Sequence, residues 1–234
     1  PKKNRKLILN NNVKYDKFEG LSKLRNNCIM YINGNKTQFQ TEFTQNGHYD
    51  VKFIINDPKL FDNAENMFLE CSSLRKVSFK NFNKPYLKNI NQIFYGCVNL
   101  ESVDLNINTE NVNHMGFMLE DCINLKSING INKFNTAKVE DMACMFYKCE
   151  SITSINLTSF KVTNVNDMPY MFSGCKSLKT IQLSDDFKVQ KNTWISGIFS
   201  GCDSLSENIK RKFKPEDMNE EKWKEDATKD CIIF

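Results

Sequence analysis

The sequence lacks any long apolar run, which argues against a membrane-spanning helix. No stretch approaches the roughly 18 consecutive apolar residues that such a helix needs. Near the amino terminus, the apolar run Leu7–Leu9 is far too short for the core of a signal peptide. If Pro1 lies close to the natural start, we expect synthesis in the cytosol with reduced thiols.

The sequence also has little excess charge and little histidine. Its 32 Lys and Arg nearly balance 28 Asp and Glu, so composition gives no indication of nucleic-acid binding. His48 and His114 stand in no pattern that suggests a nucleophile and its base. The glycine-rich phosphate-binding motifs and the H-E-x-x-H zinc motif do not occur. We therefore expect no catalytic residue, no metal site and no nucleic-acid partner.

Cysteine is plentiful, and it marks an internal repeat. Six of the nine cysteines recur every 25 to 27 residues, at Cys71, Cys97, Cys122, Cys149, Cys175 and Cys202. Around each stand apolar residues at fixed offsets, giving the unit M-F-x-x-C-x-x-L-x-x-[IV]-x-L. The third unit departs from it, with Gly130 in place of the last Leu and an apolar residue at Ile131. A constant period of this length is typical of repeat architectures.

Two periodicities within the unit predict its secondary structure. The alternation in 155–157 and 181–183 predicts a short strand with one buried face. Apolar residues at intervals of three and four before the cysteine favour a short helix or 3₁₀ turn. Because one unit cannot bury either face alone, we expect an α/β solenoid of about six stacked repeats. Single cysteines so far apart do not fit metal-binding pairs, so we expect a ladder of buried thiols.

The repeat resembles the BspA-type leucine-rich repeat, whose unit continues L-x-x-F-x-T-x-x-V-x-x-M. Residues 145–171 (MFYKCESITSINLTSFKVTNVNDMPYM) follow that unit almost position for position, and the resemblance covers about residues 63–206. It implies a leucine-rich-repeat solenoid of the kind found in surface or membrane-associated proteins of microbes and protists. It also implies a role in adhesion and protein recognition, without naming a ligand.

The sequence divides into four parts. A basic segment, 1–24, precedes a β-hairpin cap, 25–60, in which we expect strands at 28–35 and 38–43 around Gly34. An Asn46–Gly47 turn then leads into a third strand at 49–55. A separate ligand domain is the alternative for the cap. The repeats occupy 61–206, and a charged tail, 207–234, follows. We expect this tail to cover the last repeat through Ile209, Phe213, Met218 and Trp223.

The chain ends in Cys231-Ile232-Ile233-Phe234, which resembles a C-a-a-X prenylation signal. Cys231 is therefore the expected lipidation site, and a prenyltransferase is the expected modifying enzyme. The terminal Phe favours a geranylgeranyl group over a farnesyl group. The competing interpretation is a chance match. No cofactor other than this lipid is expected. We expect a lipoprotein anchored at the plasma membrane after cytosolic synthesis, with a cytoplasmic protein as the alternative.

The candidate partner-binding surface is the outward face of the predicted strands. Its columns are small and polar, and they contain no aromatic residue: Lys76, Ser102, Ser127, Ser154 and Thr180 in one, with Ser78, Asp104, Asn129, Asn156 and Gln182 in the other. The absence of stacking rings favours a protein partner over sugar or nucleic acid at this face. We therefore expect a non-enzymatic, prenylated recognition or adhesion protein. The alternatives are a soluble cytosolic scaffold that binds through the same face, or a face that serves only solubility.

Overall fold

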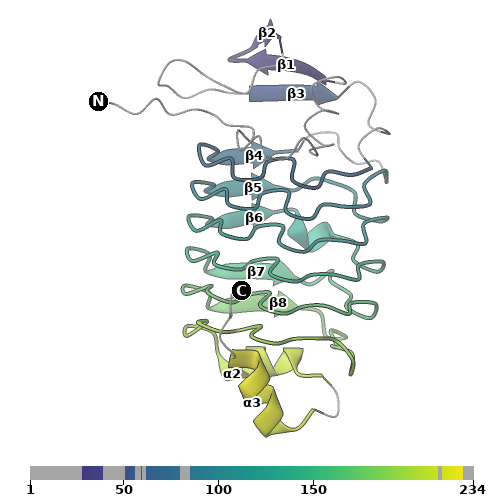
Figure 1. Cartoon of the computed structure of the whole chain (residues 1–234), viewed down its shortest axis with the longest axis vertical. Helices are drawn as coiled ribbons and strands as arrows, with labels where there is room; N and C mark the ends of the chain where they lie inside the picture. Colours follow the sequence, from purple (N-terminus) through teal and green to yellow (C-terminus); the bar gives the residue numbers. More distant parts are fainter. Residues whose placement is uncertain are drawn as a thin grey trace, which may run out of the picture.

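A computed structural model of the chain describes residues 28–38, 51–55, 59, 62–79, 85–215 and 218–228. The protein is a mixed α/β structure with small sheets and few helices. In Figure 1 the strands of successive repeats lie one below the next along the long axis. A small sheet lies at one end and the helices at the other.

The amino-terminal sheet is antiparallel, with the order β2-β1-β3. It comprises β1 (Cys28–Ile32), β2 (Asn35–Thr37) and β3 (Val51–Ile55). The second strand was expected to begin at Gln38 but lies earlier. Asn33 and Gly34 both have positive φ, 50° and 83°, which makes a tight two-residue turn, so pairing resumes at once at Asn35. The predicted Asn46–Gly47 turn lies outside the described residues.

Five short parallel strands follow, one from each of the first five repeats. They are β4 (Lys76–Ser78), β5 (Ser102–Asp104), β6 (Ser127–Asn129), β7 (Ser154–Leu157) and β8 (Thr180–Leu183). The register places equivalent repeat positions opposite each other, so that Val77 faces Val103, which faces Ile128. This agrees with the predicted alternation. In β4, β5 and β6 the central residue is more buried than its two neighbours, and in β7 and β8 more buried residues alternate with less buried ones.

The parallel strands form two sheets, β4-β5-β6 and β7-β8, and the break between them follows the irregular third repeat. Directly after β6 stands Gly130, with a φ of 85°, and then the 3₁₀ helix η2 (Ile131–Lys133). A Cβ atom on Gly130 would lie 2.8 Å from the carbonyl oxygen of Leu105, so the backbones approach here as closely as glycine allows. Ile131, the next residue along the chain, is buried.

The segment before each repeat cysteine is a series of hydrogen-bonded turns. The prediction left a short helix or a 3₁₀ turn open there, and the helix is wrong. Five residues before the cysteine the backbone is left-handed, with φ between 52° and 62°, at Asn66, Gln92, Phe117, Cys144, Tyr170 and Gly197. One residue before it φ again lies between 53° and 74°, at Glu70, Gly96, Asp121, Lys148, Gly174 and Gly201. Left-handed residues at these two points prevent a helix from propagating.

The turns pair with the turns of the next repeat through their backbones. The amides of Asn66, Phe68 and Glu70 donate to the carbonyls of Asn91, Ile93 and Tyr95, at 2.6 to 3.1 Å. Amides at intermediate positions bond within the turn, as Met67 N does to Ala64 O. Similar bonds join the third and fourth repeats, for example Leu119 N to Met145 O at 3.0 Å. The turn side is therefore continuous where the strand side is broken.

One hydrophobic core runs through all six repeats. The repeated Phe column stacks ring on ring, with centroids 5.4 Å apart for Phe146 and Phe172 and 5.5 Å for Phe172 and Phe199. Leu119 occupies this column in the third repeat, where it is fully buried. Eight of the eighteen Phe residues in the sequence are among the described residues buried in this core.

The carboxyl end covers the last repeat with α2 (Glu207–Lys210), η3 (Arg211–Phe213) and α3 (Glu220–Thr228). Phe213 and Trp223 belong to the core, and Ile209 and Met218 pack against it, which are the four contacts expected from the sequence. At the end of α3 the carbonyls of Asp226 and Ala227 accept the amides of Gly197 and Phe199. The helix thus supplies acceptors that a seventh repeat would otherwise provide. In the part of the chain that the structure describes, no helix has both the length and the apolar character to cross a bilayer.

Candidate interaction surface

The ten predicted partner-binding residues all lie on β4 to β8, as two columns of side chains; together they are called the strand face. In-register pairing places Ser102 beside Lys76 and Ser127, and Thr180 beside Ser154. The break between β6 and β7 divides each column, so the face consists of a three-strand part and a two-strand part.

The strand face is accessible, and most of its side chains make no hydrogen bond or ion pair with a described residue. Seven of its side chains are exposed, and Ser102, Asp104 and Asn156 are half-buried. Ser78 donates to Asp104 at 3.3 Å, and Asn156 accepts from the Thr158 hydroxyl at 2.8 Å. The others make no side-chain hydrogen bond or ion pair with any described residue: Lys76, Ser102, Ser127, Asn129, Ser154, Thr180 and Gln182. Their donors and acceptors are available to a partner.

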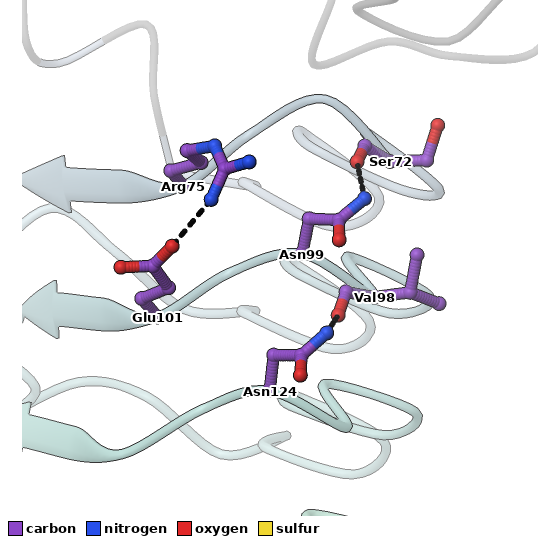
Figure 2. Close-up of polar contacts among 6 residues, drawn as sticks. All are labelled: Ser72, Arg75, Val98, Asn99, Glu101 and Asn124. Carbon is purple, nitrogen blue, oxygen red and sulfur yellow. Dashed lines mark hydrogen bonds and ion pairs between the residues drawn. The ribbon is translucent and has the colours of Figure 1, made fainter.

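Ion pairs between neighbouring repeats lie close to this face. Arg75 contacts Glu101 at 2.5 Å, and Lys176 contacts Glu150 at 2.8 Å (Figure 2 shows the first pair). Both pairs join side chains that are at least one-third exposed, so each contributes little to stability. They fix the charged rim of the surface more than they hold the fold.

A ladder of polar side chains two residues after the cysteine was missed by the sequence reasoning. Figure 2 shows Asn99 and Asn124 donating to the carbonyls of Ser72 and Val98, at 2.7 and 2.8 Å. In later repeats Ser151 and Ser204 make equivalent bonds through their hydroxyls. The signal was present, because Asn or Ser stands at this offset in every repeat. These residues satisfy backbone acceptors and are structural.

The repeat cysteines form the expected ladder of buried, free thiols. Five of them donate to the preceding repeat, where the acceptor is the carbonyl oxygen three residues before that repeat's own cysteine. The Sγ–O distances run from 2.9 to 3.2 Å. Burial raises the pKa of Cys149 and Cys175 well above the ordinary value, and that of Cys202 to about 12. Such thiols are poor nucleophiles.

A second surface feature is a groove of about 700 Å³, here called the polar groove. Its lining includes residues nine and eleven positions before the repeat cysteines: Lys88, Asn113, Glu140 and Asn166, with Lys138 and Asn164. Sequence reasoning missed it because these positions share polarity but no residue type. Only the stacking of repeats shows that they adjoin.

One carboxylate on the turn side has an unusual environment. Glu120 is half-buried, and its Oε2 atom is buried without a hydrogen-bond partner among the described residues. Burial, reinforced by the charge of Asp121, raises its pKa to about 7, although Lys148 partly opposes the shift. Within the described residues, no group of three His, Cys, Asp or Glu side chains is placed to hold a metal ion.

Two sequence candidates cannot be placed. Cys231, the expected lipidation site, and His48 both lie outside the described residues. His114 is half-buried and pairs through its backbone with Asn89 and Asp141 in the neighbouring repeats. It therefore belongs to the ladder of repeats.

Comparison with solved structures gives two similarities. One is to a leucine rich cell surface protein from Faecalibacterium prausnitzii A2-165, with 19% identity and a TM-score of 0.36 over 56% of this chain and 41% of that one. The other is to a TLR13–ssRNA13 complex, with 16% identity and a TM-score of 0.22 over 57% of this chain and 24% of that one. The chain thus spans less than half the length of either structure.

The comparison with curated proteins found no match. Among protein families, residues 62–182 and 125–228 both match the family described as "Mycoplasma protein of unknown function, DUF285". The two overlapping matches cover the whole repeat region and its carboxyl-terminal helices, and they support the resemblance to BspA-type repeats. The chain belongs to this DUF285 family.

Proposed function

We propose that the protein is a non-enzymatic leucine-rich-repeat solenoid that recognises a protein partner through its strand face, for adhesion or a related surface interaction. The observation that carries this proposal is a difference in hydrogen bonding between two groups of polar side chains. The thiols and the Asn/Ser ladder are used within the fold, whereas seven of the ten strand-face side chains bond to no described residue.

The chemistry of the strand face suits a protein partner. Hydroxyl and amide groups on neighbouring strands offer donors and acceptors about 4.8 Å apart, in rows that a protein surface can match. A charged rim around a more neutral centre is typical of protein interfaces. The strand face has no aromatic side chain, so bases or sugars would find no stacking platform there.

The proposal includes a lipid tether at Cys231. It rests on the sequence of the last four residues, which suit transfer of a geranylgeranyl or farnesyl group to the cysteine thiol. A single prenyl chain gives reversible membrane binding, and a second contact is needed for stable anchoring. The basic residues Lys2, Lys3, Arg5 and Lys6 are the candidates for that contact.

The strand-face proposal is tested by site-specific photo-crosslinking in the native host. A photoreactive residue replaces Ser154 in one variant and Glu221, which is exposed in α3 at the carboxyl-terminal end of the array (Figure 1), in another. We expect a discrete crosslinked protein from position 154 and none from position 221. Equal crosslinking from both positions, or none from position 154, would contradict the proposal.

The tether is tested by mass spectrometry of the carboxyl terminus and by fractionation of a Cys231→Ser variant. We expect a prenyl mass on Cys231, loss of the last three residues, and movement of the variant into the soluble fraction. An unmodified terminus would contradict the tether and favour the alternative, a soluble scaffold that uses the same strand face. The two tests are independent of each other.

A further inference from the structure

We propose that the polar groove binds a neutral linear glycan and that Trp194, next to the groove, packs against one of its sugar rings. This site is separate from the strand face and adds a second ligand class to the proposed function.

The groove follows the direction in which the repeats are stacked. The amide of Asn113 donates to Lys88 O at 2.9 Å, that of Glu140 to Asn113 O at 2.9 Å, and that of Asn166 to Glu140 O at 2.8 Å. These four lining residues therefore occupy equivalent places in four consecutive repeats. At the usual spacing of about 4.8 Å between paired strands, the row is roughly 15 Å long. Such a site fits an extended ligand whose polar groups recur at a regular interval.

The groove offers groups that both donate and accept hydrogen bonds. The side chains of Asn113, Glu140 and Asn166 form no hydrogen bond or ion pair with any described residue. Asn164 uses its Nδ2 atom to bind Ala137 O at 2.6 Å, which directs its amide without occupying its oxygen. Sugar hydroxyls also donate and accept, so a groove that presents amides together with amines and a carboxylate matches a row of hydroxyls better than it matches a ligand that only accepts.

The charges in and beside the groove cancel, which disfavours polyanions. Lys88 lies 3.6 Å from Asp62, and Glu140 offsets Lys138, whose amine donates to Asn111 at 2.6 Å. Nucleic acid and sulfated glycans need an excess of uncompensated positive charge. The lining also contains no apolar residue, which disfavours small apolar ligands and the aromatic anchors of protein interfaces.

Trp194 supplies an exposed apolar surface next to the last lining residue of the row, although it does not itself line the groove. Its side chain is 57% exposed, although Trp is among the most buried residue types on average. Its backbone amide donates to the carbonyl of the lining residue Asn166 at 2.7 Å, and its backbone pairs with Asp167, so Trp194 lies in the next repeat beside the last residue of the row. The apolar C–H face of a pyranose ring packs on an indole in the same way as other apolar groups, and the indole N–H can still donate to a hydroxyl.

The test uses the full chain and calorimetric titration with neutral hexasaccharides of glucose, N-acetylglucosamine, mannose and xylose. We expect one of them to bind. Trp194→Ala and the double variant Asn113→Ala with Asn166→Ala should each raise its Kd by about tenfold or more. The matched controls Asn129→Ala and Gln182→Ala, on the strand face, should leave Kd unchanged.

The replaced side chains are exposed or line an open groove, so urea unfolding should be nearly the same for all variants. The proposal would be overturned by no binding of any of these glycans, by equal losses in groove and strand-face variants, or by a groove that binds heparin or polyuridylate with a steep salt dependence. Loss of the strand-face crosslink in the groove variants would also overturn it, since the groove would then serve the protein partner. Failure of the crosslinking test alone leaves the glycan site standing.

Discussion

The thiol of Cys149 donates a hydrogen bond to the backbone carbonyl oxygen of Leu119 in the preceding repeat, at 3.2 Å. Both residues are fully buried. A serine at this position would also donate, but its hydroxyl is more costly to desolvate than a thiol. Cysteine meets two demands here, because it fills an apolar site and satisfies a carbonyl that faces the core. The same hydrogen bond recurs at the other repeat thiols that donate to the preceding repeat, which explains why the recurring position of the period is a cysteine within this sequence.

We expect Cys149→Ala to lower the free energy of unfolding by about 1–3 kcal/mol, because it removes the donor and leaves a small void. Urea denaturation followed by circular dichroism measures the change. The control is Cys144→Ala, at a half-buried position in the same repeat, where the loss should be clearly smaller. Equal losses in the two variants would show that the buried thiol has no special role.

Gly130→Ala should destabilise the protein by roughly 1–3 kcal/mol, since alanine there combines an unfavourable φ with a contact at 2.8 Å to Leu105 O. Gly34→Ala is the matched control. Gly34 has nearly the same φ, 83°, but open space around the added carbon. The difference in unfolding free energy between these two variants therefore reports the close approach of the backbones after β6. If Gly34→Ala is the more damaging change, the packing of the third repeat differs from that described.

The columns of the repeat were predictable because each requires a residue type. Cys, Phe and Leu recur where the core needs a thiol, a stacked ring or a branched side chain, so burial of Cys122 or Phe172 follows from the sequence alone. The strands were predictable as well, since apolar residues two positions apart, such as Ile155 and Leu157, indicate a strand with one buried face. These features set the stacking direction and the location of the strand face.

The left-handed turns were not predictable from composition. Phe117, Cys144 and Tyr170 share a left-handed conformation but no residue type, and none of them normally signals it. The conformation is imposed by pairing with the next repeat, which is a tertiary effect. The polar groove was hidden for a related reason: Lys88 and Asn113 adjoin only after the chain has completed a full repeat. The helix was expected because intervals of three and four occur equally in a succession of tight turns.

Glu120 should make stability fall as pH rises. Between about 4.5, the ordinary pKa of glutamate, and about 7, its folded value, the folded chain holds a proton that the unfolded chain has lost. Rising pH therefore lowers the free energy of unfolding across this window. Discounted for the solvent exposure of this half-buried group, the loss is about 1–2 kcal/mol.

Glu120→Gln removes this titration, so the stability of the variant relative to the parent should increase from pH 4.5 to pH 7.5. Urea unfolding at several pH values measures it, with the exposed Glu110→Gln as the control. Parallel profiles for the parent and Glu120→Gln would mean that the carboxylate is fully solvated.

Phe213→Ala should open the carboxyl-terminal end of the core. The ring of Phe213 is fully buried and contacts Phe172, Phe187 and Phe199, with centroids 4.8 to 5.5 Å away. We expect a loss of about 3–5 kcal/mol. Amide hydrogen exchange should become faster first in the fifth and sixth repeats. The amides of Gly197 and Phe199, which α3 protects, are the ones to follow. Unchanged exchange there would mean that the helices do not cap the array.

The central claim is that six repeats stack in register on one core, with their thiols in a row. Anomalous diffraction from sulfur, measured on crystals of the whole protein, locates those atoms directly. The account predicts that the sulfur atoms of Cys71, Cys97, Cys122, Cys149, Cys175 and Cys202 form a single line with steps of about 5 Å. Sulfur atoms scattered through the molecule, or joined in pairs about 2 Å apart as disulfides, would contradict it.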